Sequence, residues 1–293
     1  MAAPDLAADR RDGPTGVLLV VAAVCLFGTI GTARVIGPAA SSWSVGGLRL
    51  LVAVAALLAV AAWVDGPGAV WPLVRRRDSL LAGAGQAAFQ VTFLTAVQLT
   101  GVAVGTLVAI GSAPLITGVL TRTVSRRWLV ATTLGLVGLA LLVAGSPGDL
   151  SGRGTLLALG AGLSYAVYTT SSSRLAGEAP PASVTSAGFV VAAALLAPVL
   201  LVTDNSWAAT AAGLSLLAYI SLVATALAYL LFVTGLRSVP APTAQTLGLC
   251  EPLVATTLGL VVLGERLGPL GVVGAAAVFV ALVVLARVSE LSD

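Results

Sequence analysis

The sequence predicts an all-α, polytopic membrane protein of about ten transmembrane helices, arranged as two inverted five-helix repeats. Hydrophobic residues make up 58% of the chain and charged residues only 9%. Ordinary globular proteins are about 45–50% apolar and about 25% charged. Long apolar runs recur along the chain, and its second half repeats the first. A chain of this composition needs lipid as the solvent of its outer surface.

Ten apolar runs are long enough to form helices that cross a bilayer, which takes about 20 residues. Turn and charge signals such as Asp65-Gly-Pro-Gly and Ala179-Pro-Pro separate them. The first run is longer than the apolar core of a signal peptide, so we expect it to be retained. The runs cover residues 15–36, 44–64, 79–99, 102–121, 127–145, 154–174, 183–203, 210–235, 240–263 and 268–287.

The arginines predict the orientation of these helices in the membrane. All fifteen basic residues are Arg, and the positive-inside rule places them on the cytoplasmic side. With a cytoplasmic N-terminus, eleven lie inside and four (Arg34, Arg49, Arg153 and Arg266) lie outside or at outer helix ends. An even number of crossings then also places the C-terminus inside. We expect residues 1–14 and 288–293 to be cytoplasmic tails of an inner-membrane protein.

An internal repeat divides the chain into residues 15–146 and 154–287. At an offset of 138, the matches include Gly16 with Gly154, Phe27 with Tyr165, Ala55 with Ala193, Ala103 with Ala241 and Pro114 with Pro252. At an offset of 139, they include Phe93 with Phe232, Thr95 with Thr234 and Gly135 with Gly274. Each half holds five runs, and an odd number forces the second half to insert upside down. Inverted repeats of this kind are typical of transporters.

Several motifs also resemble a known family. They are Val239-Pro-Ala-Pro-Thr-Ala, Leu249-Cys-Glu-Pro-Leu, Leu263-Gly-Glu-Arg-Leu-Gly and Gly271-Val-Val-Gly-Ala-Ala, with a weaker copy around Ser112-Ala-Pro-Leu and Gly135-Leu-Val-Gly. Together they resemble the EamA-type branch of the drug/metabolite transporter superfamily. The resemblance implies a ten-helix carrier with both termini in the cytoplasm that moves amino acids and other small metabolites, often outward. The first half has Ala113-Pro114 in place of Glu-Pro, so any role for the acid is asymmetric.

Other classes of function lack the residues that they need. The chain has no His, which excludes histidine metal sites and Ser-His-Asp triads. Cys25 and Cys250 lie in apolar runs without a CxxC spacing, so we interpret them as apolar filler, with no metal site and no disulfide framework. No GxxxxGK[ST] loop is present, and the short Arg clusters do not form a nucleic-acid-binding face. The sequence predicts no enzyme, no cofactor and no nucleic-acid partner.

Glu251 is the one acid predicted to lie deep in the membrane, where an unpaired charge is costly. It either carries protons or braces neighbouring helices around Pro252. Pro114 and Pro252, at equivalent positions of the two repeats, predict helix breaks that act as hinges or line a cavity, with packing as the alternative. Arg49 lies one turn into the second run. It either reaches outward to the lipid headgroups or contacts a substrate carboxylate.

Polar and aromatic side chains predict a substrate cavity between the halves. Gln86 and Gln90 share one helix face, and the slipped alignment matches them with Thr225 and Tyr229. Tyr165 and Tyr168 lie at i and i+3 on a further run and add aromatic walls for an organic solute. Hydrogen bonding between helices and aromatic packing are the alternatives for these six residues.

The sequence therefore predicts an ATP-independent secondary transporter that exports or facilitates passage of small metabolites such as amino acids by alternating access. Its partners are the lipid bilayer, a zwitterionic or amphipathic small molecule and, if flux is coupled, protons at Glu251. The alternatives are a membrane-embedded lipid-modifying enzyme and an uptake carrier for sugar-type solutes. The substrate, the direction of flux and the oligomeric state stay open.

Overall fold

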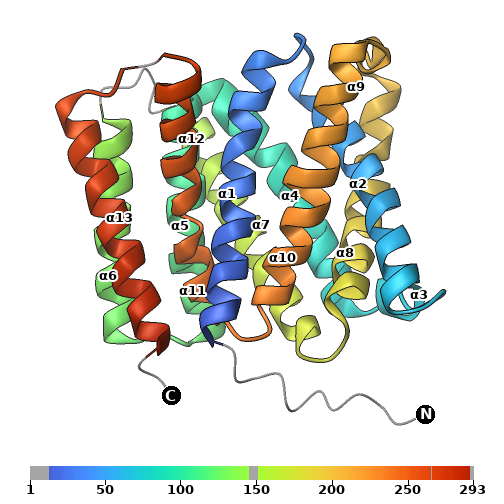
Figure 1. Ribbon diagram of the computed structural model, residues 1–293, viewed down its shortest axis with the longest axis horizontal. Coiled ribbons are helices and arrows are strands. Elements are labelled where there is room, and N and C mark those ends of the chain that lie inside the picture. Colours follow the sequence, from blue (N-terminus) through green and yellow to red (C-terminus); the bar gives the residue numbers. More distant parts are fainter. Residues whose placement is uncertain (1–12, 145–150, 265, 291–293) are drawn as a thin grey trace.

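The computed structural model describes residues 13–144, 151–264 and 266–290, with side chains from residue 14 to residue 285. Within these ranges every regular element is a helix, and the helices pack side by side in one bundle (Figure 1). The predicted tails, residues 1–14 and 288–293, lie largely outside the described residues. Helix α1 begins and helix α13 ends at the same end of the bundle, at the bottom of Figure 1.

The helices follow the predicted runs in order. The first half comprises α1 (Gly13–Ile36), α2 (Ser42–Val64), the short α3 (Trp71–Val74), α4 (Arg77–Thr100), α5 (Val102–Thr121) and α6 (Arg126–Val143). The second comprises α7 (Gly152–Ala176), α8 (Pro181–Leu196), η2 (Ala197–Leu201), η3 (Ser206–Ala209), α9 (Ala211–Ala218), the π-helix η4 (Tyr219–Leu227), α10 (Ala228–Gly235), α11 (Ala241–Leu247), α12 (Cys250–Val262) and α13 (Pro269–Glu290).

Among the described helices, eight segments are long and apolar enough to cross a membrane, so the protein is a multi-pass membrane protein. Helix α13 counts only as a shorter apolar helix over its described side chains, and α7 is not among the eight. Both still run alongside the other helices (Figure 1). Helix α7 is more polar because it is an inner helix, with thirteen of its 25 residues buried against protein. The count of ten crossings stays a prediction.

Two hydrogen-bonded contacts join the end of α2 to the start of α8, and the start of α2 to the connection that follows α8 and η2. At the end of α2, Asp65 Oδ2 accepts from the Ser183 hydroxyl at 2.6 Å and from the Ser183 backbone N–H at 3.0 Å. At the start of α2, the Ser44 hydroxyl donates to Asn205 Oδ1, also at 2.6 Å. We call these contacts the end latches. Because the start of each helix meets the end of the other, the two repeat-equivalent helices are antiparallel.

A second repeat-equivalent pair, α6 and α13, is antiparallel as well. A Cβ on Gly138 would lie 2.9 Å from the Gly274 carbonyl oxygen and 2.7 Å from the Val278 backbone nitrogen. Gly135, one turn earlier in α6, faces Ala281, which is later in α13. Residue numbers that rise along α6 therefore meet residue numbers that fall along α13, so the two helices run in opposite directions. Glycine is required here because the two backbones are nearly in contact.

The contacts between the halves keep the same pattern when the halves exchange roles. Helix α4 packs on α7, and its repeat equivalent α10 packs on α1. In the same way α5 packs on α7, and its repeat equivalent α12 packs on α1. Gly154 of α7 lies against Leu99 at the end of α4, and its repeat partner Gly16 of α1 lies against Gly235 at the end of α10. The arrangement is that of an inverted repeat.

The π-helix η4 accounts for the local offset of 139 at Phe232 and Thr234, which returns to 138 at Ala241 and Pro252. Between Ala193 and Phe232 the second half has one residue more than the first, and η4 lies inside this stretch. A π-helix bonds residue i to residue i+5, so each of its turns holds more residues than an α-turn. The Thr225 hydroxyl likewise donates to the carbonyl of Ile220, five residues back, at 2.6 Å. The wider turn therefore takes up the extra residue.

The α6–α13 contact yields a stability prediction. We expect Gly138→Ala to destabilise the protein by about 1–3 kcal/mol, because the new methyl group overlaps backbone atoms that cannot move aside. Gly160→Ala is the matched control, since its Cβ would meet only Thr92 Cγ2 at 3.8 Å. Thermal unfolding of both variants in detergent measures the difference. Equal melting temperatures would show that the backbones of α6 and α13 are not in close contact.

Candidate functional site

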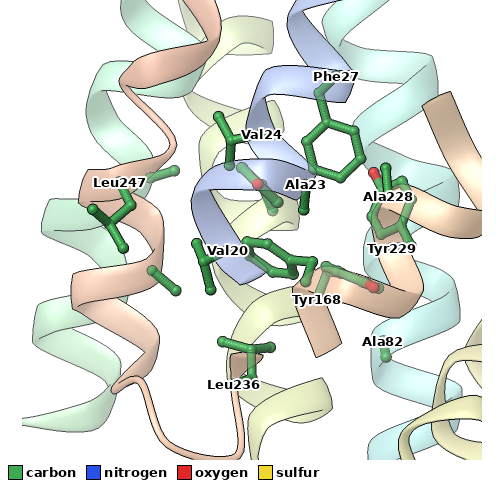
Figure 2. Close-up of a cluster of buried hydrophobic side chains, with 14 of the residues drawn as sticks. Val20, Ala23, Val24, Phe27, Ala82, Tyr168, Ala228, Tyr229, Leu236 and Leu247 are labelled. Atoms are coloured by element: carbon green, nitrogen blue, oxygen red, sulfur yellow. The ribbon is translucent and has the colours of Figure 1, made fainter. Parts of the chain in front are cut away.

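Aromatic rings from both halves form a continuous cluster inside the bundle. Five of the six Phe and three of the four Tyr join it through ring-centroid distances of 4.7–6.5 Å. Figure 2 shows Phe27 of α1 directed towards Tyr229 of α10, with Tyr168 of α7 below them. The Tyr229 ring also meets the edges of Tyr168 and Phe189. The interface between the repeats is thus lined by rings.

Two glutamines of α4 carry the polar contacts of this region. Gln86 is buried, and its Nε2 donates to the Tyr229 hydroxyl at 3.0 Å, which joins the two halves. Gln90, one turn further, is partly exposed, and its Oε1 accepts from Arg49 at 3.2 Å. The sequence predicts both glutamines on one helix face, and the structure shows them directed at different partners.

Arg49 points into the bundle and does not reach outward to the headgroups. Its Nη2 donates to Gln90, and its Nε is buried without a hydrogen bond to any described residue. Gly46, one turn earlier in α2, leaves the space for this contact, because a Cβ there would collide with the Gln90 amide. Of the two sequence interpretations of Arg49, the structure therefore favours the inward one.

Glu251 lies where the ninth predicted run is interrupted. Helix α11 ends at Leu247 and α12 begins at Cys250, so Glu251 occupies the first turn of α12 in mid-membrane. Pro252 has no N–H for the carbonyl of Gly248, which instead accepts from the Glu251 N–H at 3.0 Å. The positive end of the α12 dipole favours a carboxylate at this place. In the first half, α5 continues through Pro114 without interruption, so the two prolines differ.

Arg49 and Glu251 are opposite charges that attract each other without forming an ion pair. Among the described residues the salt bridges are Arg76–Glu178 and Arg174–Asp78, at 2.7 and 3.6 Å. Arg49 belongs to α2 of the first half and Glu251 to α12 of the second, and the two charges are within electrostatic range of each other. Both charged side chains are partly exposed although each belongs to a membrane-spanning segment. They are available to a third, charged group.

The predicted cavity residues divide into two groups. Of the six, Gln90 is partly exposed, as is the predicted coupling or bracing acid Glu251, whereas the other five are buried at 0–7% exposure: Gln86, Tyr165, Tyr168, Thr225 and Tyr229. The Thr225 hydroxyl is already bonded to a backbone carbonyl. Whether either group contacts a substrate stays a prediction.

Sequence reasoning missed Gln245 of α11. Its Nε2 donates to the Thr169 hydroxyl at 2.6 Å and to the Tyr165 carbonyl at 3.2 Å, which ties α11 to α7. Gln245 is 1% exposed. The sequence signal for Gln245 was the same as for Gln86, because an amide in an apolar run needs a hydrogen-bond partner.

Comparisons with known proteins agree with this architecture. The sequence profile of the EamA-like transporter family matches residues 152–287. The uncharacterized transporter YwfM of Bacillus subtilis (strain 168) is 40% identical over 279 residues, which cover 92% of each protein. The threonine/homoserine exporter RhtA of Escherichia coli (strain K12) is 32% identical over 164 residues, 55% of this chain and 54% of RhtA.

A solved crystal structure has the same fold, with a TM-score of 0.80 at 18% identity, over 95% of this chain and 98% of the other. The fold, the inverted packing and the sequence similarity along nearly the whole chain lead to one conclusion. The chain belongs to the EamA-like transporter family, and it is a multi-pass membrane transporter.

Proposed function

We propose that this transporter is an ATP-independent secondary carrier of small zwitterions such as amino acids, working by alternating access. The observation that carries the proposal is the accessible and unpaired couple of Arg49 and Glu251, placed between two inverted halves. A charge at this depth is costly, so its retention indicates a function. The similarity to RhtA, named a threonine/homoserine exporter, supports the same substrate class.

Each charge suits one end of a zwitterion. The Arg49 guanidinium, held by Gln90, has the planar donor geometry that carboxylates prefer. Glu251, at the start of α12, accepts an ammonium group. The rings around Tyr229 form an apolar wall for the rest of the solute.

The inverted packing supplies two conformations of similar energy. Because α4–α7 and α10–α1 are equivalent contacts, tightening one while loosening the other opens opposite ends of the bundle. The end latches, one at each end of α2, need not break in this exchange. Glu251 is placed to bind either a proton or the substrate ammonium, which would couple the two fluxes.

We further propose an inner-membrane location with both termini in the cytoplasm. Among the described residues, Arg75, Arg76, Arg77, Arg122, Arg126, Arg127, Arg174 and Arg237 lie in or beside the connections at the end where α1 begins. Arg34, Arg153 and Arg266 lie at the other end. The positive-inside rule makes the arginine-rich end cytoplasmic.

Arg49 provides the first test of zwitterion transport. In proteoliposomes screened with radiolabelled amino acids, we expect Arg49→Gln to raise the concentration for half-maximal flux about ten- to hundredfold, because about 1.5–3 kcal/mol of charged hydrogen bonding is lost. Arg49→Lys keeps the charge but lacks the planar guanidinium, so its concentration for half-maximal flux should lie between those of the wild type and Arg49→Gln. Arg75→Gln is the control, since Arg75 is an exposed loop residue. Wild-type affinity in Arg49→Gln would contradict carboxylate binding there.

Glu251 provides the test of coupling. Glu251→Gln keeps the shape and hydrogen-bonding capacity of the side chain but removes the proton site. We expect flux driven by a pH gradient to collapse, while exchange without a gradient survives at saturating substrate with a raised concentration for half-maximal exchange, because the ammonium contact is weakened; both are measured side by side in the same preparation. A bracing role predicts instead that Gln is tolerated and that Glu251→Ala lowers the melting temperature. Gradient-driven flux at the wild-type rate in Glu251→Gln rules out proton coupling.

Reporter fusions test the orientation. Fusions after Gly68 and at Arg126 should report the cytoplasm, because both sites lie at the arginine-rich end of the bundle. A fusion after Asn205, in the connection between η2 and η3, should report the external side, as should one at Asp149, which lies outside the described residues. The opposite pattern at the three described sites would invert the proposed topology.

A further inference from the structure

The only two cysteines of the chain meet inside the bundle. Cys25 of α1 and Cys250 of α12 are 225 residues apart in sequence, and their sulfurs are 3.9 Å apart. Both are free thiols, and both are partly exposed. In the sequence they look like unrelated apolar filler, since no spacing connects them. Their contact joins the first half of the molecule to the second, directly beside Glu251.

The backbones of α1 and α12 are close enough for a covalent bond between these side chains. Gly28, one turn beyond Cys25, lies so near α12 that a Cβ would be 2.8 Å from the Glu251 carbonyl oxygen and 2.9 Å from Val254 Cβ. A disulfide needs sulfurs about 2.05 Å apart and Cα atoms about 4.4–6.8 Å apart. Rotation of the two side chains brings the sulfurs together without parting the helices.

We propose that Cys25 and Cys250 form a thiol–disulfide site that clamps α1 to α12 and stops transport when it is oxidised. The oxidant is a small-molecule disulfide, R–S–S–R. One cysteine thiolate attacks it, forms a mixed disulfide and releases one R–S⁻. The second cysteine attacks the protein sulfur of that mixed disulfide, closes the Cys25–Cys250 bond and releases the second R–S⁻. The two thiol protons end on two R–SH molecules, so the protein loses two electrons that the small disulfide gains.

The clamp blocks transport because of where it lies. The α1–α12 contact is the repeat equivalent of α5–α7, and these two contacts exchange roles in alternating access. A covalent bond at one of them holds the protein in one of its two conformations. In the first half, Ser112 stands at the position of Cys250 and lies against Gly162 of α7, so the other contact has no thiol to oxidise. Oxidation can therefore lock only the α1–α12 contact and not the α5–α7 contact, and a thiol reductant reverses the lock.

The test uses the full-length chain in proteoliposomes, treated with glutathione disulfide and then with dithiothreitol. Half of each sample is denatured, alkylated with a maleimide and weighed by intact mass spectrometry; the other half is assayed for amino-acid flux. Reduced protein carries two adducts, and the clamped protein carries none and stays monomeric on a non-reducing gel. Cys25→Ser and Cys250→Ser are matched controls that keep one thiol and cannot close the bond.

We expect wild-type adducts to fall from two to zero on oxidation, with at least a tenfold loss of flux that dithiothreitol restores. Each serine variant keeps its flux through the same treatment. Persistence of two adducts, or of a stable mixed disulfide, overturns the site. Closure of the bond with unchanged flux overturns the clamp. Because closure is read from mass alone, failure of the site is distinguishable from failure of the proposed transport activity.

Discussion

The end latches between α2 and α8 define the geometry on which the rest of the structure depends. Asp65 reaches Ser183 at one end and Ser44 reaches Asn205 at the other, both through 2.6 Å hydrogen bonds. Each latch pairs a polar group at one end of α2 with a polar group of the second half. The antiparallel pairing that results requires an odd number of crossings in each half. The latches therefore hold α2 and α8 in the antiparallel arrangement of an inverted repeat.

Close approach of the backbones reinforces this geometry. Between α6 and α13 the contact is made by Gly138 and Gly274, and lipid tails provide no hydrophobic force to replace it. The small residues that make the composition look featureless are therefore placed where the helices cross. The same holds beside the charged interior, where Gly28 lets α1 lie against the backbone at Glu251 and Gly46 gives Gln90 its place next to Arg49.

The sequence predicts the order of the helices, their approximate ends and the inverted arrangement, because apolar length and repetition are properties of the chain itself. It does not predict the π-helix, although the slip of one residue between Phe93 and Phe232 is its signature. The helix break also lies slightly before the position predicted from Pro252, between Leu247 and Cys250. A proline predicts a weakened helix, but tertiary packing decides that α5 stays whole at Pro114 while α11 and α12 separate.

The sequence does not predict which distant residues come into contact, because helix packing decides this. The sequence leaves both an outward and an inward direction open for Arg49, and the hydrogen bond to Gln90 of α4 holds it inward. Cys25 and Cys250 look like filler until α1 and α12 are brought together. Side-chain chemistry sets which residues are suited to a site, and helix packing sets which of them meet.

The account rests on one claim, that Arg49 and Glu251 recognise the two ends of a zwitterion between the halves of the protein. Counterflow competition in proteoliposomes tests it directly, by comparing a transported amino acid with its N-acetyl derivative and its methyl ester. Each derivative removes one of the two charges and leaves the side chain unchanged. The account predicts that the amino acid competes and that both derivatives compete at least tenfold less well. Equal competition by all three would show that the two charges do not recognise the solute.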